Sequence, residues 1–596
     1  MDWDLSTYFP SIEDTAYTDF KARLRDDIAR LRKEAEALPV AGADPGTWEK
    51  FLRTYEDLLA RVSHLGSYVS CLCAADAEKE LHQQEEAALA DLRAGYDILH
   101  NRLLLAVGAL SEEGFSDLCT APALRDLAPI LRKWREEAQK RMPRELEELN
   151  SELGVNGLSA WSRLYFQLMG KMNFRYDDPE EGEKEVPMAH YTSLLSDPDR
   201  QRRRAVFDGA AKALTTHETT CAAALNAIAG TRHTLNRRRD LDNFLDPSLR
   251  QSRLSLEGLD ALMGAIDKRL PFAREVFRFR SAQMGIEDPG YHDLRAPIPL
   301  EGGTTPGWAE GTRLISRSFH GAYPRLGSFF DEMTEKRWID HSPRSGKRPG
   351  GFCSPSLYAR ESRIFMTYRD CLPDVLTLAH EAGHAFHSHV LGKERPLRAG
   401  YTMPLAETAS TFAEKILTEG VLSDGDIPHV DKCRLLDAEI EHMLAFLLDL
   451  PVRFRFEREL YRRRQDKTLS VREIRELMEE TQRTVFSNSL AESGLDSGFW
   501  ISKLHFYISG VQFYNYPYTF GYLLSTAFME RLRSEGTGFL RQYEEFLRLT
   551  GHCDCETAVR ESIGEDIREE AFWLRQIDAL QRPFETYKAM VADMRA

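Results

Sequence analysis

The sequence predicts an all-α protein that carries one small hairpin or sheet. Apolar residues recur three and four positions apart, which is typical of amphipathic helices. One such run is Leu436, Ile440, Met443, Leu444 and Leu447. Charges alternate along helical faces in residues 19–38, 84–110 and 455–485. With 596 residues and 42% hydrophobic content, the chain is long enough to bury a substantial core and to form several domains.

An acidic segment with one glycine divides the sequence. Residues 176–185 fit either a linker or the turn of a hairpin between Phe174 and Val186. We place the domain boundary just after it. Residues 1–190 are expected to form a helical N-terminal domain, and residues 191–596 are expected to form a second domain.

Residues 380–384 read His-Glu-Ala-Gly-His, a pattern typical of zinc-dependent peptide hydrolases. On a helix, His380 and His384 project from one face about 5–6 Å apart at Cβ, so both can bind one metal ion. Glu381 points to the side of that face, where it can act as a general base on a zinc-activated water rather than bind the metal.

The flanking residues predict that this motif lies in the middle of a largely buried helix. Pro373 suits the first turn of a helix, and Gly392 suits its end. Leucine, alanine and phenylalanine side chains between them supply apolar surface. The two histidines are therefore expected on a rigid element.

A second helix is predicted to supply the third metal ligand. Pro404 stands at its start and Gly420 past its end. We expect Glu407 to be the ligand, because a catalytic zinc takes three protein ligands and keeps one position for water. Glu414, two turns farther on the same face, can orient a ligating histidine. His387 is expected to be structural, because a fourth protein ligand would close the site.

Three segments together resemble the oligoendopeptidase F branch of the thimet-oligopeptidase-like zinc peptidases. They are residues 380–388, Glu407–Ser410 with Glu414, and the aromatic run near residue 514. The resemblance covers most of the chain and is strongest between residues 350 and 525. It implies a zincin-type peptidase, mostly α-helical, with a deep substrate channel, a single zinc ion and cleavage of short peptides. Residues 1–190 would then form one wall of the channel, and residues 191–596 would be the catalytic zinc peptidase domain.

The resemblance also implies groups that stabilise an oxyanion. Amide hydrolysis passes through a tetrahedral oxyanion, and a donor aimed at that oxygen helps the zinc. In the family a histidine and tyrosines of the corresponding stretch give this help, which suggests His505 with one or two of Tyr514, Tyr518 and Tyr522. Pro517 is expected to open a helix with Tyr518 and Tyr522 on one face. The alternative for each tyrosine is packing against the core.

A glycine-rich turn at 348–353 and a short strand at 362–368 precede the metal helix. A strand beside a cleft can bind an extended peptide through main-chain hydrogen bonds, with little sequence preference. We expect such a substrate-binding edge here. The alternative is a small structural hairpin.

Charge and cysteine content restrict the partners and the compartment. A net charge of −16 argues against nucleic acid, and the short basic runs at 202–204 and 237–239 are expected to be solvated helix faces. Nine cysteines spread over a long chain fit a reducing compartment. No basic N-terminal leader and no stretch of 18 consecutive apolar residues is visible. We expect a cytoplasmic protein with no membrane partner.

The function that the sequence predicts is a zinc-dependent endopeptidase that cuts internal bonds of short oligopeptides. Zinc would be held by His380, His384 and Glu407, with Glu381 as the general base. A zinc carboxypeptidase on a similar helical scaffold is the alternative, and a peptide-binding module with a structural metal is a second one. The sequence leaves the oligomeric state open.

Overall fold

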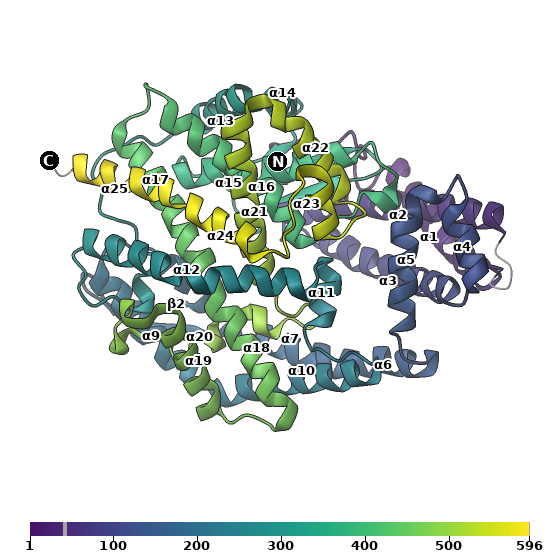
Figure 1. Ribbon diagram of the computed structural model, residues 1–596, viewed down its shortest axis with the longest axis horizontal. Coiled ribbons are helices and arrows are strands. Elements are labelled where there is room, and N and C mark those ends of the chain that lie inside the picture. The colour runs from purple at the N-terminus through teal and green to yellow at the C-terminus, as the bar shows by residue number, and fades with distance from the viewer. Residues whose placement is uncertain (40–43, 595–596) are drawn as a thin grey trace. The chain divides into compact units, whose positions relative to one another are not determined.

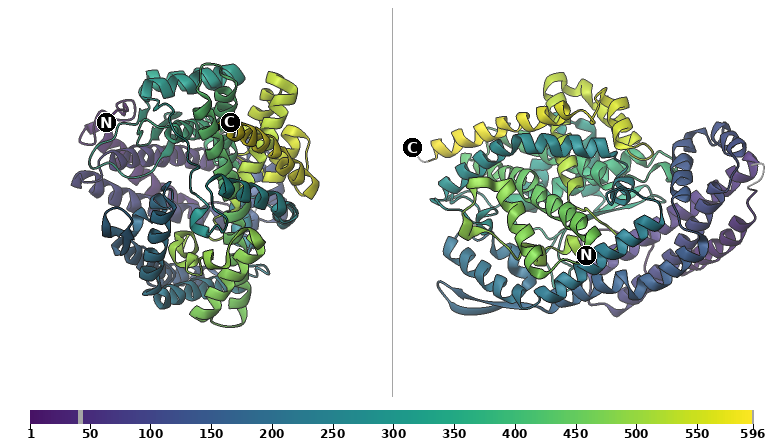
Figure 2. Two further views of the ribbon diagram at one scale, coloured as in Figure 1. Left: turned by 90° about the vertical axis from the view of Figure 1, so that its left-hand side faces the viewer. Right: turned by 60° about the horizontal axis from the view of Figure 1, so that its bottom comes forward.

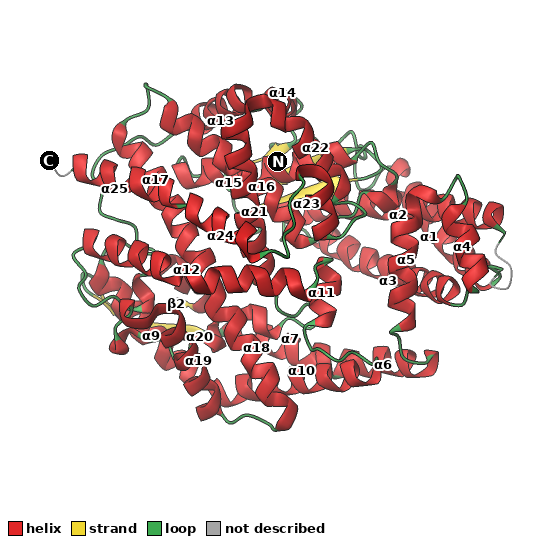
Figure 3. Cartoon of the chain, viewed as in Figure 1, coloured by secondary structure: helices red, strands yellow, loops and turns green. Residues whose placement is uncertain are grey.

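The computed structural model describes residues 1–39 and 44–594, and most of these residues are helical (Figure 3). The strands are short and form one sheet of two strands and one of three. The predicted all-α class with a small sheet is therefore confirmed.

The described chain forms two compact units, and each unit gathers three segments that are distant in sequence. Unit 1 consists of Met1–Arg141, Thr304–Ile427 and Ser525–Glu565. Unit 2 consists of Met142–Gly303, Pro428–Leu524 and Asp566–Ala596. The boundary that we place near residue 190 stays a prediction.

Unit 1 begins with a group of long helices that pack side by side (Figures 1 and 2). Their shared core contains fully buried side chains such as Trp48, Leu99 and Leu131. The helices of the unit are α1 (Thr15–Glu36), α2 (Pro45–Ala75), α3 (Glu80–Gly108), α4 (Glu112–Thr120), α5 (Ala128–Gln139), α13 (Trp308–Ala322), α14 (Pro324–Glu335), α15 (Leu372–Leu391), α16 (Met403–Ser423), α22 (Leu540–Leu549) and α23 (Cys555–Ile563).

The three-stranded sheet of unit 1 has the order β3-β5-β4, so β4 (Phe352–Ser356) is an edge strand. It pairs antiparallel with β5 (Glu361–Phe365), which pairs parallel with β3 (Ile339–Asp340). Both β4 and β5 contact α15, and Phe365 belongs to the core of the N-terminal helices. The sheet thus links the helix of the histidine motif to the core of the unit.

Among the described helices, α2 alone is long and apolar enough to pass a length-and-composition test for a membrane span. However, 78% of the apolar window is buried inside the structure. Its partners include α1, α3 and β4. The apolar character of α2 is explained by its place in the core of unit 1.

Unit 2 contains a two-stranded hairpin and a larger set of helices. The hairpin joins β1 (Asn173–Asp178) to β2 (Gly182–Pro187) in antiparallel register, with Phe174 opposite Val186. This settles residues 176–185 as a hairpin rather than a linker. The helices are α6 (Arg144–Asn156), α7 (Leu158–Lys171), α8 (Tyr191–Leu194), α9 (Arg200–Thr215), α10 (Glu218–Arg238), α11 (Asp246–Ser252), α12 (Leu256–Gln283), α17 (His429–Leu444), α18 (Leu450–Asp466), α19 (Val471–Phe486), α20 (Phe499–Ser502), α24 (Glu570–Ala579) and α25 (Gln581–Asp593).

One basic side chain of the run at 202–204 is not solvated. Arg203 is 1% exposed and its guanidinium pairs with the fully buried Asp293 at 2.8 Å. The expectation of a solvated helix face is wrong for this residue, because a carboxylate that is distant in sequence compensates the buried charge.

Candidate active site

The helix α15 carries both histidines of the motif, one turn apart. It begins after Cys371, whose backbone is extended, with Pro373 in its first turn, and it ends at Gly392 as the sequence predicts. Most of the apolar side chains of α15 are buried, whereas His380 and His384 are half-buried. The two imidazoles therefore lie on a partly open face of a helix that is otherwise packed.

The helix α16 approaches α15 closely and brings a carboxylate to these imidazoles. Gly383 permits this approach, since a Cβ there would lie 2.7 Å from the Ala409 carbonyl oxygen and 2.7 Å from Ser410 Cα. Pro404 stands in the first turn of α16, as predicted. Glu407 follows one turn later.

Gly420 lies inside α16 rather than past its end, so the predicted end of this helix is wrong. A Cβ at Gly420 would lie 2.3 Å from Ser318 Oγ and 3.0 Å from Ser318 Cα on α13. The glycine allows two helices to pack closely. A sequence pattern cannot distinguish that role from a helix stop.

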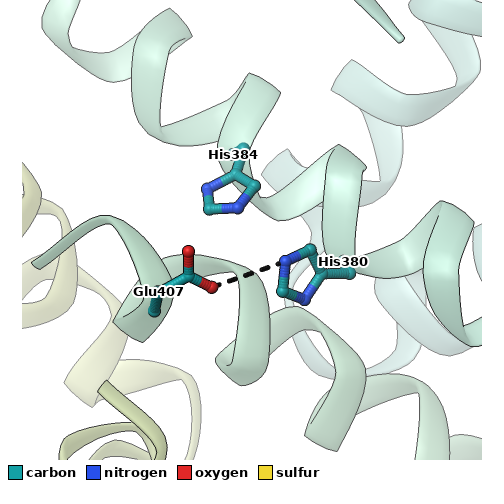
Figure 4. Close-up of side chains that lie close together, drawn as sticks. All are labelled: His380, His384 and Glu407. Carbon is teal, nitrogen blue, oxygen red and sulfur yellow. Dashed lines mark ion pairs between the residues drawn. The ribbon is translucent and has the colours of Figure 1, made fainter. Parts of the chain in front are cut away.

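Three side chains from these two helices gather into a candidate metal site (Figure 4). His380, His384 and Glu407 each offer one ligand atom, and these atoms lie within 4.8 Å of one another. Nε2 of His380 is 3.6 Å from Oε2 of Glu407. Two ligand atoms about 2 Å from a tetrahedral zinc ion would be about 3.3 Å apart, and two histidines with one glutamate form a known catalytic donor set. The three side chains therefore fit a zinc ion.

Glu414 fixes the orientation of one histidine. Its Oε1 forms a short hydrogen bond with Nδ1 of His380, which is the contact that the sequence predicts for Glu414. Because Nδ1 is engaged, Nε2 of His380 is the nitrogen that faces Glu407. Burial alone would lower the pKa of His380, but Glu414 and the nearby carboxylates raise this pKa to about 9.

Ser410 holds the third candidate ligand. Its Oγ donates hydrogen bonds to the backbone oxygen of Glu407 at 3.0 Å and to Oε2 of Glu407 at 3.4 Å. Burial raises the pKa of Glu407, and the charge of Glu414 adds to this effect. Carboxylates held together in a partly dry volume repel one another, and a divalent cation would relieve this repulsion.

Glu381 lies on the same helix as the two histidines but outside the group of candidate ligands. Its side chain is buried, at 7% exposure, and the backbone N–H of Cys353 on β4 donates to it. Burial, reinforced by the carboxylates of Glu407 and Glu414, raises the pKa of Glu381 to about 7. A carboxylate with such a pKa is suited to accept and return a proton at neutral pH.

Two other histidines of α15 differ in their surroundings: His384 is a candidate ligand, and His387 is a buried side chain. Burial lowers the pKa of His384, and so does nearby His380, which favours the neutral imidazole that a metal needs. His387 is fully buried, with Nε2 2.7 Å from Thr550 Oγ1 and its ring stacked on Tyr401. Burial lowers the pKa of His387 to about 3. The structural role predicted for His387 agrees with these contacts.

The four residues predicted to help the oxyanion lie in unit 2, and the structure gathers three of them. The rings of His505 and Tyr514 stack with centroids 5.0 Å apart, and the Tyr518 hydroxyl donates to the Tyr514 hydroxyl at 3.2 Å. Tyr522 is 3% exposed and stacks on Phe446 with centroids 4.5 Å apart. Tyr518 and Tyr522 both lie on α21 (Tyr516–Glu535), which begins beside Pro517 as predicted.

An arginine that the sequence does not single out holds the loop between His505 and Tyr514. The guanidinium of Arg232 on α10 donates to three backbone oxygens of this loop, at 2.6, 3.1 and 2.8 Å, which belong to Ile508, Ser509 and Val511. The contacts join residues 276 to 279 positions apart. No local pattern could have indicated them.

Two family models match the chain. The model described as peptidase family M3 matches residues 325–578, and the model described as oligopeptidase F matches residues 107–174. The first range contains the candidate metal site and the segment from His505 to Tyr522.

The chain is also similar to curated proteins and to solved structures. Oligopeptidase PepF of Bacillus subtilis is 23% identical over 62% of this chain and 55% of its own length. The chain spans 55 to 61% of the length of the first three curated relatives that it matches. A crystal structure of a candidate peptidase from Chlamydophila abortus is 18% identical, with a TM-score of 0.79 over 98% of both chains. Oligoendopeptidase-F from Enterococcus faecium is 15% identical, with a TM-score of 0.71 over 97% of this chain and 99% of the other. At these identities the solved structures show a shared fold.

Proposed function

Because the chain belongs to peptidase family M3, as its resemblance to oligoendopeptidase F predicts, we propose that it is a zinc-dependent endopeptidase of short oligopeptides. The observation that supports this most is the gathering of His380, His384 and Glu407 within 4.8 Å, with the buried Glu381 on the same helix. This donor set is typical of catalytic rather than structural zinc sites.

In the mechanism that we propose, His380, His384 and Glu407 hold the metal. A bound zinc ion supplies Lewis acidity, which lowers the pKa of water and polarises a carbonyl group. Glu381 accepts the proton of the attacking water and later returns it to the leaving amine. Glu414 keeps Nδ1 of His380 engaged, so that Nε2 remains the ligand atom.

We assign the stabilisation of the oxyanion to His505, Tyr514 and Tyr518. The hydroxyl of Tyr518 donates to that of Tyr514, which leaves the Tyr514 proton for an oxyanion. His505 stacks on Tyr514 and supports its ring. Tyr522, which is buried against Phe446, is given a packing role in this proposal.

The substrates that we propose are short peptides bound in an extended form. β4 is the edge strand of its sheet and follows Gly350 and Gly351, whose missing side chains allow a peptide backbone to approach. Main-chain pairing along an edge gives affinity with little preference for side chains. Seven of the nine cysteines, Cys71, Cys73, Cys119, Cys221, Cys353, Cys371 and Cys433, are free thiols, which supports our proposal of a cytoplasmic location.

Peptides blocked at both ends test this function. The purified protein is loaded with zinc, its metal content is measured, and it is incubated with a varied mixture of N-acetylated, C-amidated peptides. We expect internal cleavage, seen by mass spectrometry as paired fragments. A zinc carboxypeptidase would leave the blocked peptides intact and shorten the same peptides when their C-termini are free. A metal-loaded protein that cuts neither set would contradict the proposal and support a binding module.

A further inference from the structure

A cluster of three cations in unit 2 has no role in the proposed mechanism. Arg295, Arg453 and Lys503 are close enough to interact electrostatically around the buried Asp449. The ring of Phe499 lies beneath two of them, 4.6 Å from Lys503 Nζ and 5.5 Å from the Arg453 guanidinium carbon. Asp449 closes a π-helical turn, Ala445–Asp449, and such turns are frequent at functional sites.

The carboxylates near this cluster are already engaged. Asp449 accepts hydrogen bonds from the hydroxyl of Tyr291 and from the guanidinium of Arg453. Asp496 accepts from the backbone N–H groups of Gly498 and Phe499. Three cations therefore face two carboxylates, and the cluster has an excess of positive charge.

Two of the cations have no ion-pair partner among residues 1–39 and 44–594. Neither Lys503 nor Arg295, both half-buried, has a carboxylate within 4.0 Å. Burial, with the nearby Arg453, lowers the pKa of Lys503 to about 7, and the charges of Asp449 and Asp496 offset only part of this shift. An anion beside Lys503 would remove this penalty.

Buried hydrogen-bond donors of the cluster also lack acceptors in the described part of the chain. Nε of Arg453 and Nδ2 of Asn515 have no partner, although these side chains are only 7% and 1% exposed. The two side chains touch, with Nη1 of Arg453 3.5 Å from Oδ1 of Asn515. Buried donors are rarely left unsatisfied in native proteins, so a bound acceptor is expected here.

We propose that Lys503, Arg295 and Arg453 bind a carboxylate of a peptide ligand, either its C-terminal carboxylate or an acidic side chain. A carboxylate offers two oxygens to the planar guanidinium donors and an opposite charge to the ammonium group. The identity of the ligand rests on the proposed function, because peptides are the anions that a peptidase encounters. The site itself rests on the unpaired cations and donors.

Direct binding measurements test the site without relying on turnover. Isothermal titration calorimetry uses the full-length, zinc-loaded protein with the substitution Glu381→Gln, and mass spectrometry after titration checks that the peptides are intact. Four N-acetylated tripeptides are compared. They are trialanine as the free acid, trialanine amide, Ala-Glu-Ala amide and Ala-Gln-Ala amide. We expect at least one acidic peptide to bind about tenfold tighter than its neutral counterpart, as a charge-assisted contact predicts. The pair that shows the preference identifies the source of the carboxylate.

Substitutions in the same background assign the preference to the cluster. Lys503→Met removes the charge but keeps a long apolar stem over Phe499, and it should reduce the preference to nearly onefold. Lys503→Arg should retain it, and so should Lys212→Met, which removes an exposed lysine of the same unit. Arg295→Gln, which should also weaken the preference, serves as a second probe if circular dichroism shows that Lys503→Met is misfolded.

Two results would overturn the site. One is equal binding of acidic and neutral peptides, and the other is a preference that survives both Lys503→Met and Arg295→Gln. These results are independent of hydrolysis. Cleavage of blocked peptides without a binding preference would support the proposed function and contradict the carboxylate site. A binding preference without cleavage would support the site and contradict the proposed function.

Discussion

The candidate metal site and the His505–Tyr522 segment are built in different ways. His380, His384 and Glu407 come from two regular helices held together by the close contact at Gly383. His505 lies in a 3₁₀ turn, Leu504–Tyr507, and Tyr514 lies in the loop that follows. In that loop Phe513 has the left-handed φ of 53°, and its N–H donates to Glu457.

The two regions therefore differ in the contacts that fix the positions of their side chains. On a helix, the spacing of residues fixes which side chains share a face. In the loop, positions depend on distant partners, such as the Arg232 guanidinium that binds three of its backbone oxygens. The side chains on the helices are thus in position once the helices pack. The loop, by contrast, must be held by contacts from α10 and α18.

The substitution Glu381→Gln should have the largest effect on the chemistry while leaving the metal site intact. It removes the proposed base but keeps the size of a buried side chain, so we expect kcat to fall by about 10² to 10⁴. Zinc content, measured by atomic absorption, should stay at the parent level. The exposed Glu561→Gln is a matched control in the same unit. A Glu381→Gln protein that turns over peptides like the parent would disprove the base assignment.

Two tyrosine substitutions probe the His505–Tyr522 segment, in which Tyr514 lies in the loop and Tyr522 lies on α21. Tyr514→Phe removes the hydroxyl that we aim at the oxyanion, and kcat should fall by about 10² to 10³ with little change in KM. Tyr522→Phe removes a buried hydroxyl on the same segment and should leave kcat within about threefold of the parent if its role is packing. Steady-state kinetics with one peptide measure both. Equal losses of kcat in the two variants would contradict the assignment of an oxyanion role to Tyr514 and a packing role to Tyr522.

The substitution Glu414→Gln tests how the helices orient a ligand. The carboxylate that engages Nδ1 of His380 is replaced by a weaker partner, so we expect zinc affinity to fall by about 10-fold to 100-fold. Competition with a chromogenic chelator measures the affinity. Excess zinc should restore most of the activity that the variant loses through weaker zinc binding. If the affinity were unchanged, the contact between Glu414 and His380 would have no part in metal binding.

These contrasts also show how much of the site the sequence could predict. The start of α15, the start of α16 and the contact between Glu414 and His380 follow from helical spacing and proline placement, and all three are confirmed. The all-α class and the family also follow from the sequence, and the hairpin at 173–187 was one of two alternatives. Each of these depends on local patterns, namely the spacing of residues within a helix or hairpin and short motifs.

The features that the sequence missed depend on tertiary contacts. Gly420 is explained by Ser318 on another helix, and Arg203 is buried because Asp293 pairs with it. The stacking of Tyr522 on Phe446 was one of two alternatives for each tyrosine, and the sequence could not show which tyrosine would take it. A pattern of residue types cannot show which distant side chain will be present, so such roles become visible only in the folded chain.

The smallest expected effect concerns the support beneath the metal helix rather than the chemistry. Thr550→Val keeps the shape of the side chain but removes the hydroxyl that contacts Nε2 of the buried His387. Because His387 also has a hydrogen bond to the backbone of Leu547, the loss of the Thr550 contact should lower the free energy of unfolding by about 0.5–1.5 kcal/mol. Urea denaturation followed by circular dichroism measures this change. Thr484→Val, at an exposed helical position, should lower the free energy of unfolding far less.

Zinc content and kcat of Thr550→Val should be unchanged, because His387 is held outside the group formed by His380, His384 and Glu407. A loss of zinc in Thr550→Val without a loss of stability would instead give His387 a part in the metal site.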